Sequence, residues 1–183
     1  MGAREDLLGQ IKDKAVVHGR VTLSSGREAD YYVDLRRITL DAVASPLVGK
    51  VMLDLTEDLT FDAVGGLTLG ADPVAYAIAY ASALAGRPLR AFTVRKEAKQ
   101  HGTGRLIEGP YREGDRVVVI EDVITTGGSA LRAVEALRAA GGTVVGVLAV
   151  VDREEGGREA IEAAGLPVVA LARAADIVAR MPA

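Results

Sequence analysis

Residues 117–134 read VVVIEDVITTGGSALRAV, and this stretch decides the fold. It opens with four apolar β-branched residues, the composition of a buried strand. The run from Ala130 to Ala140 has the apolar spacing of a helix and is followed by two glycines, which commonly end helices. Thr125-Thr126-Gly127-Gly128-Ser129 lies between the two. The stretch therefore predicts a strand, a glycine-rich loop and a helix.

The predicted loop has the composition of a phosphate site. A helix N-terminus offers free N–H groups and a positive dipole end, glycines let the backbone approach closely, and hydroxyl groups add donors. Glu121 and Asp122 precede the loop and would repel a phosphate unless they bind something else, such as sugar hydroxyls or a divalent metal. A ribose phosphate fits both features. The alternative is a plain strand-to-helix turn in which the two acids act as caps.

Two other phosphate motifs do not fit this segment. A P-loop requires a lysine after the glycines, and none is present. The dinucleotide-binding pattern G-x-G-x-x-G is also missing.

Further strands and helices are expected to alternate around this segment. The strands are nearly continuous apolar runs, typical of a parallel sheet covered on both faces. Right-handed crossovers then give a doubly wound, mainly parallel α/β sheet with helices on both faces. Strands are expected at residues 61–67, 90–94, 117–120, 144–151 and 168–171, and helices at 73–84, 130–140 and 158–164. Asp72 is a plausible N-cap of the first of these helices, with Pro73 at its first position.

The first sixty residues do not join this alternation. A short amphipathic helix is expected at residues 2–14, extended segments at 15–23 and 31–35, and a helix at 41–58. We expect a single domain over residues 1–183, with a small hood-like appendage contributed mainly by about residues 15–40.

A long irregular stretch, residues 95–114, follows one predicted strand and contains four glycines. Loops of this length in a compact domain are usually functional or mobile. A lid that closes cations over a departing polyphosphate would need such a composition, whereas the alternative is a solvated basic turn. Three cations and a histidine lie in its first half: Arg95, Lys96, Lys99 and His101.

Two more segments end strands at the same predicted edge of the sheet, where ligands bind in open α/β folds. Residues 65–72 (GGLTLGAD) offer backbone amides before a helix. Arg153 ends another strand and could form paired hydrogen bonds with a carboxylate. The alternative for Arg153 is a surface salt bridge with Asp152 or Glu154.

Composition excludes several classes of protein. A net charge of −3 gives no overall attraction for nucleic acid or an anionic membrane. Without cysteine there is no disulfide, thiolate metal site or cysteine nucleophile. The acidic Met1–Asp6 segment is unlike a signal peptide, and the apolar runs fall short of a membrane span. A cytoplasmic protein is expected.

Together these segments resemble the type I phosphoribosyltransferases, whose diphosphate-sugar motif matches residues 117–129. Four further segments resemble the orotate-specific branch of that family: RKEAKQHG, VGGLTLGADPVA, VVDR and the stretch LSSGREADYYVDLR at residues 23–36. The likeness covers residues 17–153 in order. It implies transfer of the 5-phosphoribosyl group from phosphoribosyl diphosphate to orotate, giving orotidine 5′-phosphate and diphosphate on the route to UMP.

The resemblance also implies roles for particular residues. The donor is contacted by Arg95, Lys96, Lys99, His101, Glu121, Asp122, Val123, Ile124, Thr125, Thr126, Gly127, Gly128 and Ser129. Orotate is contacted by Thr125 and Arg153. Lys99, His101 and Asp122 act in catalysis. Mg²⁺ is held mainly by the donor diphosphate, without a dedicated protein site. A homodimer is implied, with part of the lid reaching the neighbouring subunit's site.

The sequence departs from many family members at two places. Ser24 and Thr68-Leu69 stand where many carry lysine and Tyr-Lys, so the diphosphate contacts there are left open. Two alternatives to the orotate activity are a phosphoribosyltransferase for a purine or other base, and a non-catalytic sensor of phosphoribosyl diphosphate. Arg153 and the SSGR–YY stretch argue against the first, and the cationic lid and the acidic net charge argue against the second.

Overall fold

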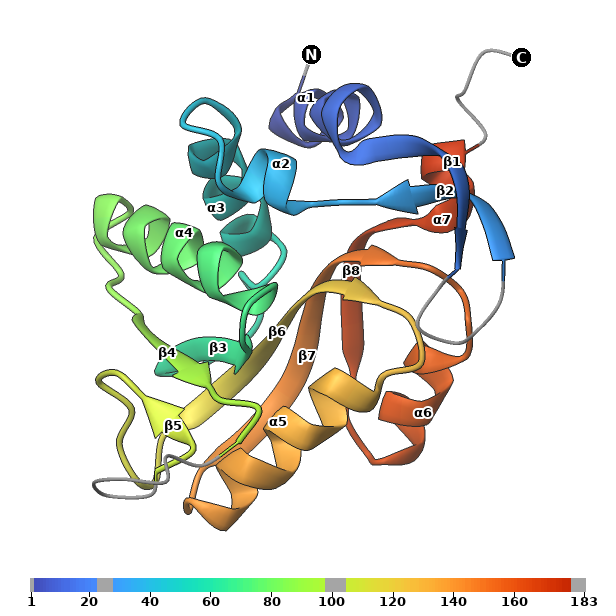
Figure 1. The fold of residues 1–183 in the computed structure, drawn as a ribbon. Coiled ribbons are helices and arrows are strands. Elements are labelled where there is room, and N and C mark those ends of the chain that lie inside the picture. The colour runs from blue at the N-terminus through green and yellow to red at the C-terminus, as the bar shows by residue number, and fades with distance from the viewer. Residues whose placement is uncertain (1, 23–27, 98–104, 179–183) are drawn as a thin grey trace.

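The computed structural model describes residues 2–22, 28–97 and 105–178. At its centre lies a six-stranded sheet in the order β5-β4-β3-β6-β7-β8 (Figure 1). Neighbouring strands run parallel, except that β5 is antiparallel to β4. The predicted doubly wound, mainly parallel sheet is therefore confirmed. The strands are β3 (Ala63–Leu67), β4 (Arg90–Val94), β5 (Ile107–Glu108), β6 (Arg116–Ile124), β7 (Thr143–Asp152) and β8 (Val168–Arg173).

Helices cover both faces of this sheet, as Figure 1 shows. Side chains of β6 alternate between two cores because successive strand residues point to opposite faces. Val118 and Ile120 pack with α1, α3 and α4, whereas Val117 and Val119 pack with α5 and α6. The helices are α1 (Ala3–Gln10), α2 (Arg36–Thr39), α3 (Ala44–Asp54), α4 (Ala71–Leu84), α5 (Gly128–Ala139), α6 (Gly157–Ala163) and α7 (Ala174–Val178), with a π-helical turn η1 (Ile11–Ala15) after α1.

Strand β6 is longer than predicted. The expected strand ended at residue 120, but the pairing with β7 continues to Ile124, which lies opposite Asp152. The cause is β7, which itself extends far enough to offer backbone partners. Glu121 and Asp122 therefore belong to the strand rather than to the loop that follows it.

Helix α4 begins earlier than predicted. Gly70 is its N-cap residue, so Asp72 lies inside the first turn and the prediction that Asp72 caps the helix was wrong. The Asp72 carboxylate instead accepts hydrogen bonds from the hydroxyls of Thr68 and Thr93.

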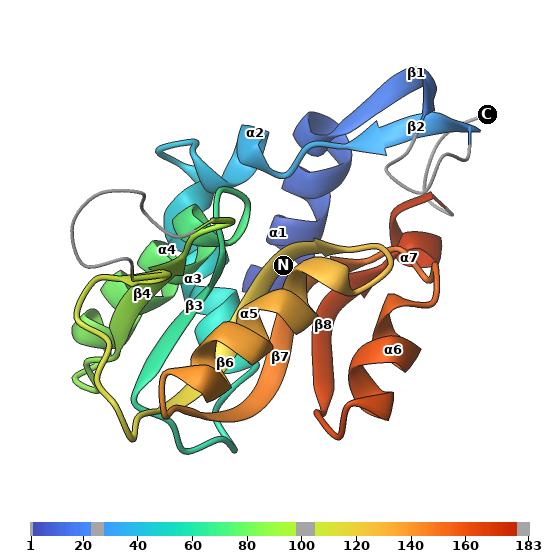
Figure 2. The same ribbon diagram turned by 60° about the horizontal axis from the view of Figure 1, so that its bottom comes forward.

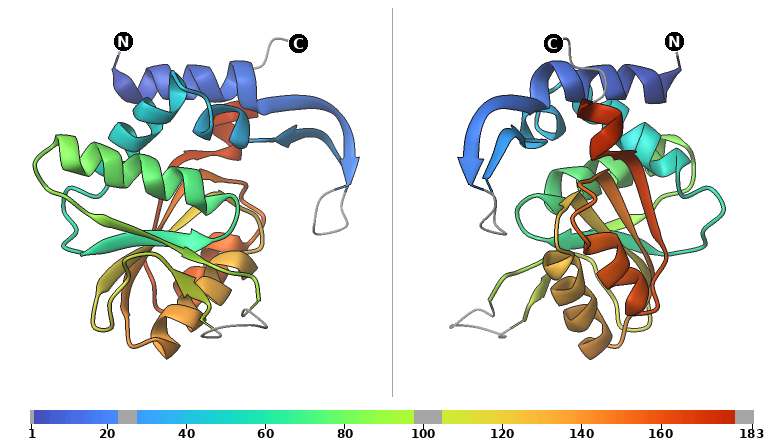
Figure 3. Two further views of the ribbon diagram at one scale, coloured as in Figure 1. Left: turned by 60° about the vertical axis from the view of Figure 1, so that its left-hand side comes forward. Right: turned by 90° about the vertical axis from the view of Figure 1, so that its right-hand side faces the viewer.

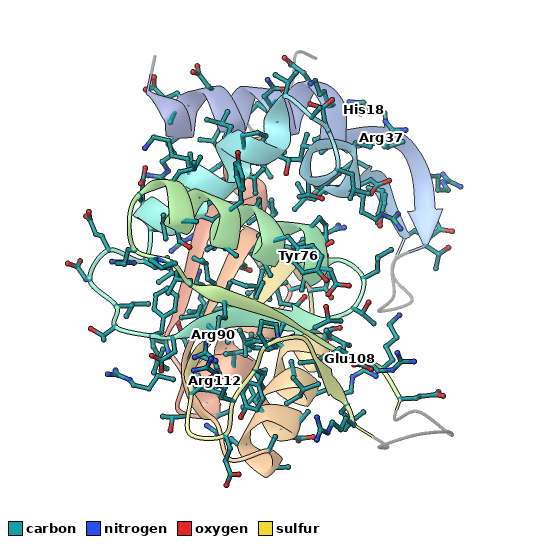
Figure 4. All side chains as sticks on the ribbon, turned by 90° about the vertical axis from the view of Figure 1, so that its left-hand side faces the viewer. His18, Arg37, Tyr76, Arg90, Glu108 and Arg112 are labelled. Atoms are coloured by element: carbon teal, nitrogen blue, oxygen red, sulfur yellow. The ribbon has the colours of Figure 1, made fainter. Side chains whose placement is uncertain are left out.

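Part of the stretch predicted as irregular is regular. Residues 107–108 form the edge strand β5, which pairs with Thr93 and Val94 of β4. Asp115 anchors the turn that follows, because its carboxylate accepts two hydrogen bonds from Arg90, at 2.7 and 2.8 Å, and one from the backbone N–H of Arg112. Arg90 and Arg112 lie side by side in Figure 4.

The N-terminal region forms a separate antiparallel pair, β1 (Val16–Thr22) and β2 (Glu28–Val33). Figures 2 and 3 show this hairpin standing off from the main sheet beyond α2. Leu7 and Ile11 of the preceding helical segment are fully buried in the core above the sheet. Among the described residues, no helix has the length and apolar character to cross a membrane.

Candidate functional site

The carboxyl ends of β3, β6 and β7 meet at one edge of the sheet, where ligands bind in open α/β folds. Each strand is followed by residues that the sequence singled out: residues 68–72 after β3, residues 125–129 after β6 and Arg153 after β7. The hairpin β1–β2 rises near the same side of the molecule in Figure 2.

The loop after β6 borders a cavity of about 450 Å³ at the N-terminus of α5. Gly127 is the N-cap residue, and its φ of 80° lies in the left-handed region that favours glycine. The first turn of α5 thus presents backbone N–H groups to the cavity, as a phosphate site requires. The lining residues are Glu121, Val123, Ile124, Thr125, Thr126, Gly127, Gly128, Ser129, Ala130 and Arg132.

Two glycines from different segments, Gly127 and Gly157, hold the shape of this loop. A Cβ atom on Gly157 would overlap the carbonyl oxygen of Thr125, and one on Gly127 would lie 2.8 Å from the carbonyl oxygen of Gly157. The backbone of the loop therefore rests directly on the start of α6. The sequence analysis missed Gly157, although the pair Gly156-Gly157 after a strand was a signal for such close approach.

Glu121 points from β6 into the cavity. It is 7% exposed, and its Oε1 atom has no hydrogen-bond partner in the described part of the chain. Burial and the charge of the neighbouring Asp122 together raise the pKa of this carboxyl to about 8, although the charge of Arg132 opposes them. Arg132, which also lines the cavity, was not singled out from the sequence.

Asp122 points to the opposite face of β6, as the alternation of strand side chains requires. A Cβ atom on Gly70 would overlap its carboxylate, so the loop after β3 passes directly over Asp122. Burial raises the pKa of Asp122; the backbone N–H of Val123, 2.9 Å from Oδ1, and the charge of Arg36 lower it. The two acids thus face different sides of the strand, one beside the phosphate loop and one beneath the loop of residues 68–70.

The cationic segment after β4 is only partly described. Arg95 N–H donates to the carbonyl of Leu106, and the Arg95 guanidinium lies 3.8 Å from the Glu108 carboxylate on β5. Lys96 is exposed. The predicted catalytic residues Lys99 and His101 lie outside the described residues.

Arg153 lies beside Thr125, since its backbone N–H donates to the carbonyl of Ile124 at 3.0 Å. The structure thus brings together the two residues predicted to contact orotate. Arg153 is 8% exposed, and its Nε atom lies 3.0 Å from Oε1 of Glu155. The alternative partners considered for a salt bridge, Asp152 and Glu154, were wrong.

Asp152 has a different partner. Its carboxylate accepts from Arg158 Nε at 2.8 Å and from the backbone N–H of Glu154 at 2.9 Å. This nearly fully buried carboxylate shapes the turn that carries Arg153.

The comparisons with known proteins agree with this geometry. The phosphoribosyl transferase domain family matches residues 46–164. The chain is 68% identical over 165 residues to an orotate phosphoribosyltransferase of Streptomyces avermitilis, covering 90% of this chain and 91% of that protein. It is similar to Mycobacterium tuberculosis orotate phosphoribosyltransferase in complex with Fe(III) dicitrate, with a TM-score of 0.86, 57% identity, and 96% and 99% of the two chains covered. For the complex of that protein with 5-phospho-α-D-ribosyl 1-diphosphate, the TM-score is 0.84 at 52% identity, with 97% and 99% covered.

Proposed function

Because the chain belongs to the phosphoribosyl transferase domain family, and within it to the orotate phosphoribosyltransferases, we propose that it transfers the 5-phosphoribosyl group of phosphoribosyl diphosphate to orotate. The products are orotidine 5′-phosphate and diphosphate, and the reaction serves the de novo synthesis of UMP. A relative solved with phosphoribosyl diphosphate supports the donor.

One observation carries the proposal. The backbone N–H of Arg153 donates to the carbonyl of Ile124, so Arg153 adjoins the phosphate loop that begins at Thr125. A ligand that spans Thr125 can therefore place a phosphate on residues 125–129 and an acidic base against Arg153. Orotate carries such a carboxylate, whereas uracil and the purine bases do not.

In the reaction, a ring nitrogen of orotate bonds to C1 of the ribose while the bond from C1 to the diphosphate oxygen breaks. The leaving group takes the electron pair, so positive charge develops at C1 and negative charge on the diphosphate. Glu121 and Asp122 hold the ribose hydroxyls, and Asp122 stabilises the positive charge at C1. Arg95, Lys96, Lys99 and His101 stabilise the leaving diphosphate.

Mg²⁺ bound with the donor would supply positive charge that stabilises the leaving diphosphate. Within the described residues, His, Asp and Glu side chains do not form a group of three that could hold a metal ion. We propose that the donor's phosphates carry most of the contacts to this cation.

We further propose that the protein works as a cytoplasmic homodimer whose subunits share their sites. The cationic segment after β4 starts at the edge of the sheet, next to β5, where it can reach a neighbouring subunit. The single domain with a hood over about residues 15–40 belongs to the same proposal, and the hairpin β1–β2 supports it.

The test is a direct assay. Protein, orotate, phosphoribosyl diphosphate and Mg²⁺ are mixed, and the loss of orotate absorbance is followed. Uracil, adenine and hypoxanthine are then tried in place of orotate. Turnover with orotate alone supports the proposal, turnover with a purine indicates the other transferase activity, and donor binding without turnover indicates the non-catalytic sensor.

A further inference from the structure

A buried carboxylate lies outside the residues assigned above. Asp72, in the first turn of α4, is 8% exposed. Its Oδ2 accepts from the Thr68 hydroxyl at 2.7 Å, and its Oδ1 accepts from the Thr93 hydroxyl at 2.9 Å. Each oxygen thus has its own hydroxyl donor, as a buried carboxylate requires.

The two threonines belong to different parts of the site. Thr68 opens the loop of residues 68–70, which passes over Asp122 at Gly70. Thr93 lies on β4, two residues before Arg95. Asp72 therefore joins the loop above the catalytic carboxylate to the strand that leads into the cationic segment.

The network has a defined direction. A hydroxyl carries one hydrogen, and that of Thr93 is donated to Asp72. Tyr76, one turn further along α4, lies 3.1 Å from the Thr93 hydroxyl and must therefore be the donor of that bond. Figure 4 shows Tyr76 on α4. The chain of bonds runs from Tyr76 through Thr93 to Asp72.

This arrangement also explains how a carboxylate is tolerated here. The two hydroxyl hydrogen bonds offset the cost of removing this carboxylate from water. Many family members carry Tyr-Lys where this chain has Thr68-Leu69, and in this chain the Thr68 hydroxyl is one of the two donors to Asp72.

We propose that Asp72 is a positioning residue for the donor's diphosphate: through Thr68 and Thr93 it fixes the 68–70 loop relative to the start of the cationic segment. The proposal rests on the proposed function, because it assumes that this half of the site receives the diphosphate. Asp72 touches no substrate in this role.

The test compares Thr68→Val and Thr93→Val with Thr68→Ser and Thr93→Ser in the full-length protein. The valine variants should raise the KM for phosphoribosyl diphosphate by about tenfold, because small displacements of binding groups are costly, and leave the KM for orotate unchanged. The serine variants keep the hydroxyl and should restore wild-type values. Asp72→Asn should behave like the valine variants if it folds.

The matched control is Ser82→Ala on the same helix. The Ser82 hydroxyl donates to the carbonyl of Ala79 and accepts from the backbone N–H of Leu89, far along α4 from Asp72. Loss of the Ser82 hydroxyl should lower the thermal unfolding temperature. It should not raise the KM for phosphoribosyl diphosphate relative to the KM for orotate. If the valine variants show this pattern too, Asp72 is only structural and the proposal is overturned.

Calorimetry can measure the binding of inorganic diphosphate in the presence of Mg²⁺. This measurement tests the role of Asp72 independently of the transferase activity. Wild-type protein that turns over no base would contradict the proposed function. Diphosphate binding weakened in the valine variants and restored by serine would still support the positioning role, and equal binding in all variants would overturn it.

Discussion

The guanidinium carbon of Arg153 lies 5.2 Å from the centre of the Tyr31 ring. Tyr31 belongs to β2, whose only strand partner in the described structure is β1, and Arg153 follows the last residue of β7. The contact therefore ties the N-terminal hairpin to the end of β7, where the acceptor is proposed to bind. We therefore expect the Tyr31 ring to help orient the Arg153 guanidinium.

This contact predicts a different result for two substitutions of Tyr31. Tyr31→Phe keeps the ring and should leave the KM for orotate close to wild type. Tyr31→Leu removes a cation–π contact of about 0.5–2 kcal/mol, so the KM should rise by about two- to thirtyfold. Steady-state kinetics with saturating donor measure this difference, and equal values for the two variants would show that the ring does not orient Arg153.

Arg153 itself should determine the affinity for orotate. A hydrogen bond to a charged group contributes about 1.5–3 kcal/mol, so Arg153→Ala should raise the KM for orotate by about ten- to a hundredfold. Arg153→Lys should restore little, since lysine cannot form the paired hydrogen bonds. The KM for phosphoribosyl diphosphate should stay unchanged. A rise in both KM values would point to collapse of the turn that Asp152 and Arg158 hold.

The sequence predicted the parts of the site that depend on local patterns. Apolar runs, helix spacing and the Thr125–Ser129 loop are encoded within a few residues, so the central sheet and the phosphate loop followed from them. The strand was expected to end at Ile120, before Glu121 and Asp122, whereas β6 contains both acids. Their inclusion in the strand depended on the length of β7, which lies elsewhere in the sequence.

Contacts between residues far apart in the sequence could not be predicted from such local patterns. Gly157 against Gly127, Gly70 over Asp122 and Tyr31 beside Arg153 each arise only when separate elements pack together. Asp72 shows the limit most clearly. Its position before Pro73 is typical of an N-cap, yet two threonine hydroxyls from different elements hold it inside the helix.

Gly70 offers a test of the close approach over Asp122. Gly70→Ala places a methyl group where the Asp122 carboxylate lies, so the loop or the carboxylate must move. The affinity for phosphoribosyl diphosphate should fall by about tenfold or more. Gly9→Ala in α1 is the control, because open space surrounds it and the change should stabilise the helix by about 0.5–1 kcal/mol. Unchanged donor affinity in Gly70→Ala would remove this loop from the donor site.

Lys99 lies outside the described residues, and its predicted role rests on the sequence. Lys99→Ala should lower kcat by about a hundredfold or more, because the leaving diphosphate loses a cation, and should leave thermal unfolding unchanged. Lys50→Ala is the matched control, since Lys50 pairs with Asp54 on the exposed surface of α3. Equal turnover of the two variants would exclude Lys99 from the reaction.

The buried carboxyl of Glu121 should make stability depend on pH. Its pKa is about 8 in the folded protein, against an ordinary value of 4.5, because burial disfavours the charged form. Between these values the folded protein keeps the proton and the unfolded chain releases it. This carboxyl therefore lowers the free energy of unfolding progressively as the pH rises through that window, and its full cost is reached above pH 8.

Glu121→Gln removes the ionisation while keeping a side chain of similar size. The variant should gain stability relative to wild type as the pH rises from about 5.5 to about 8.5, because a tenfold difference in proton affinity between the folded and unfolded chains corresponds to about 1.4 kcal/mol. Denaturant unfolding at several pH values measures the difference. Glu135→Gln on the exposed face of α5 removes a charge without removing a buried carboxyl, so its difference from wild type should stay constant. If the stability difference between Glu121→Gln and wild type were also constant with pH, Glu121 would already be ionised in the folded protein. Its Oε1 atom would then be bound by water or an ion.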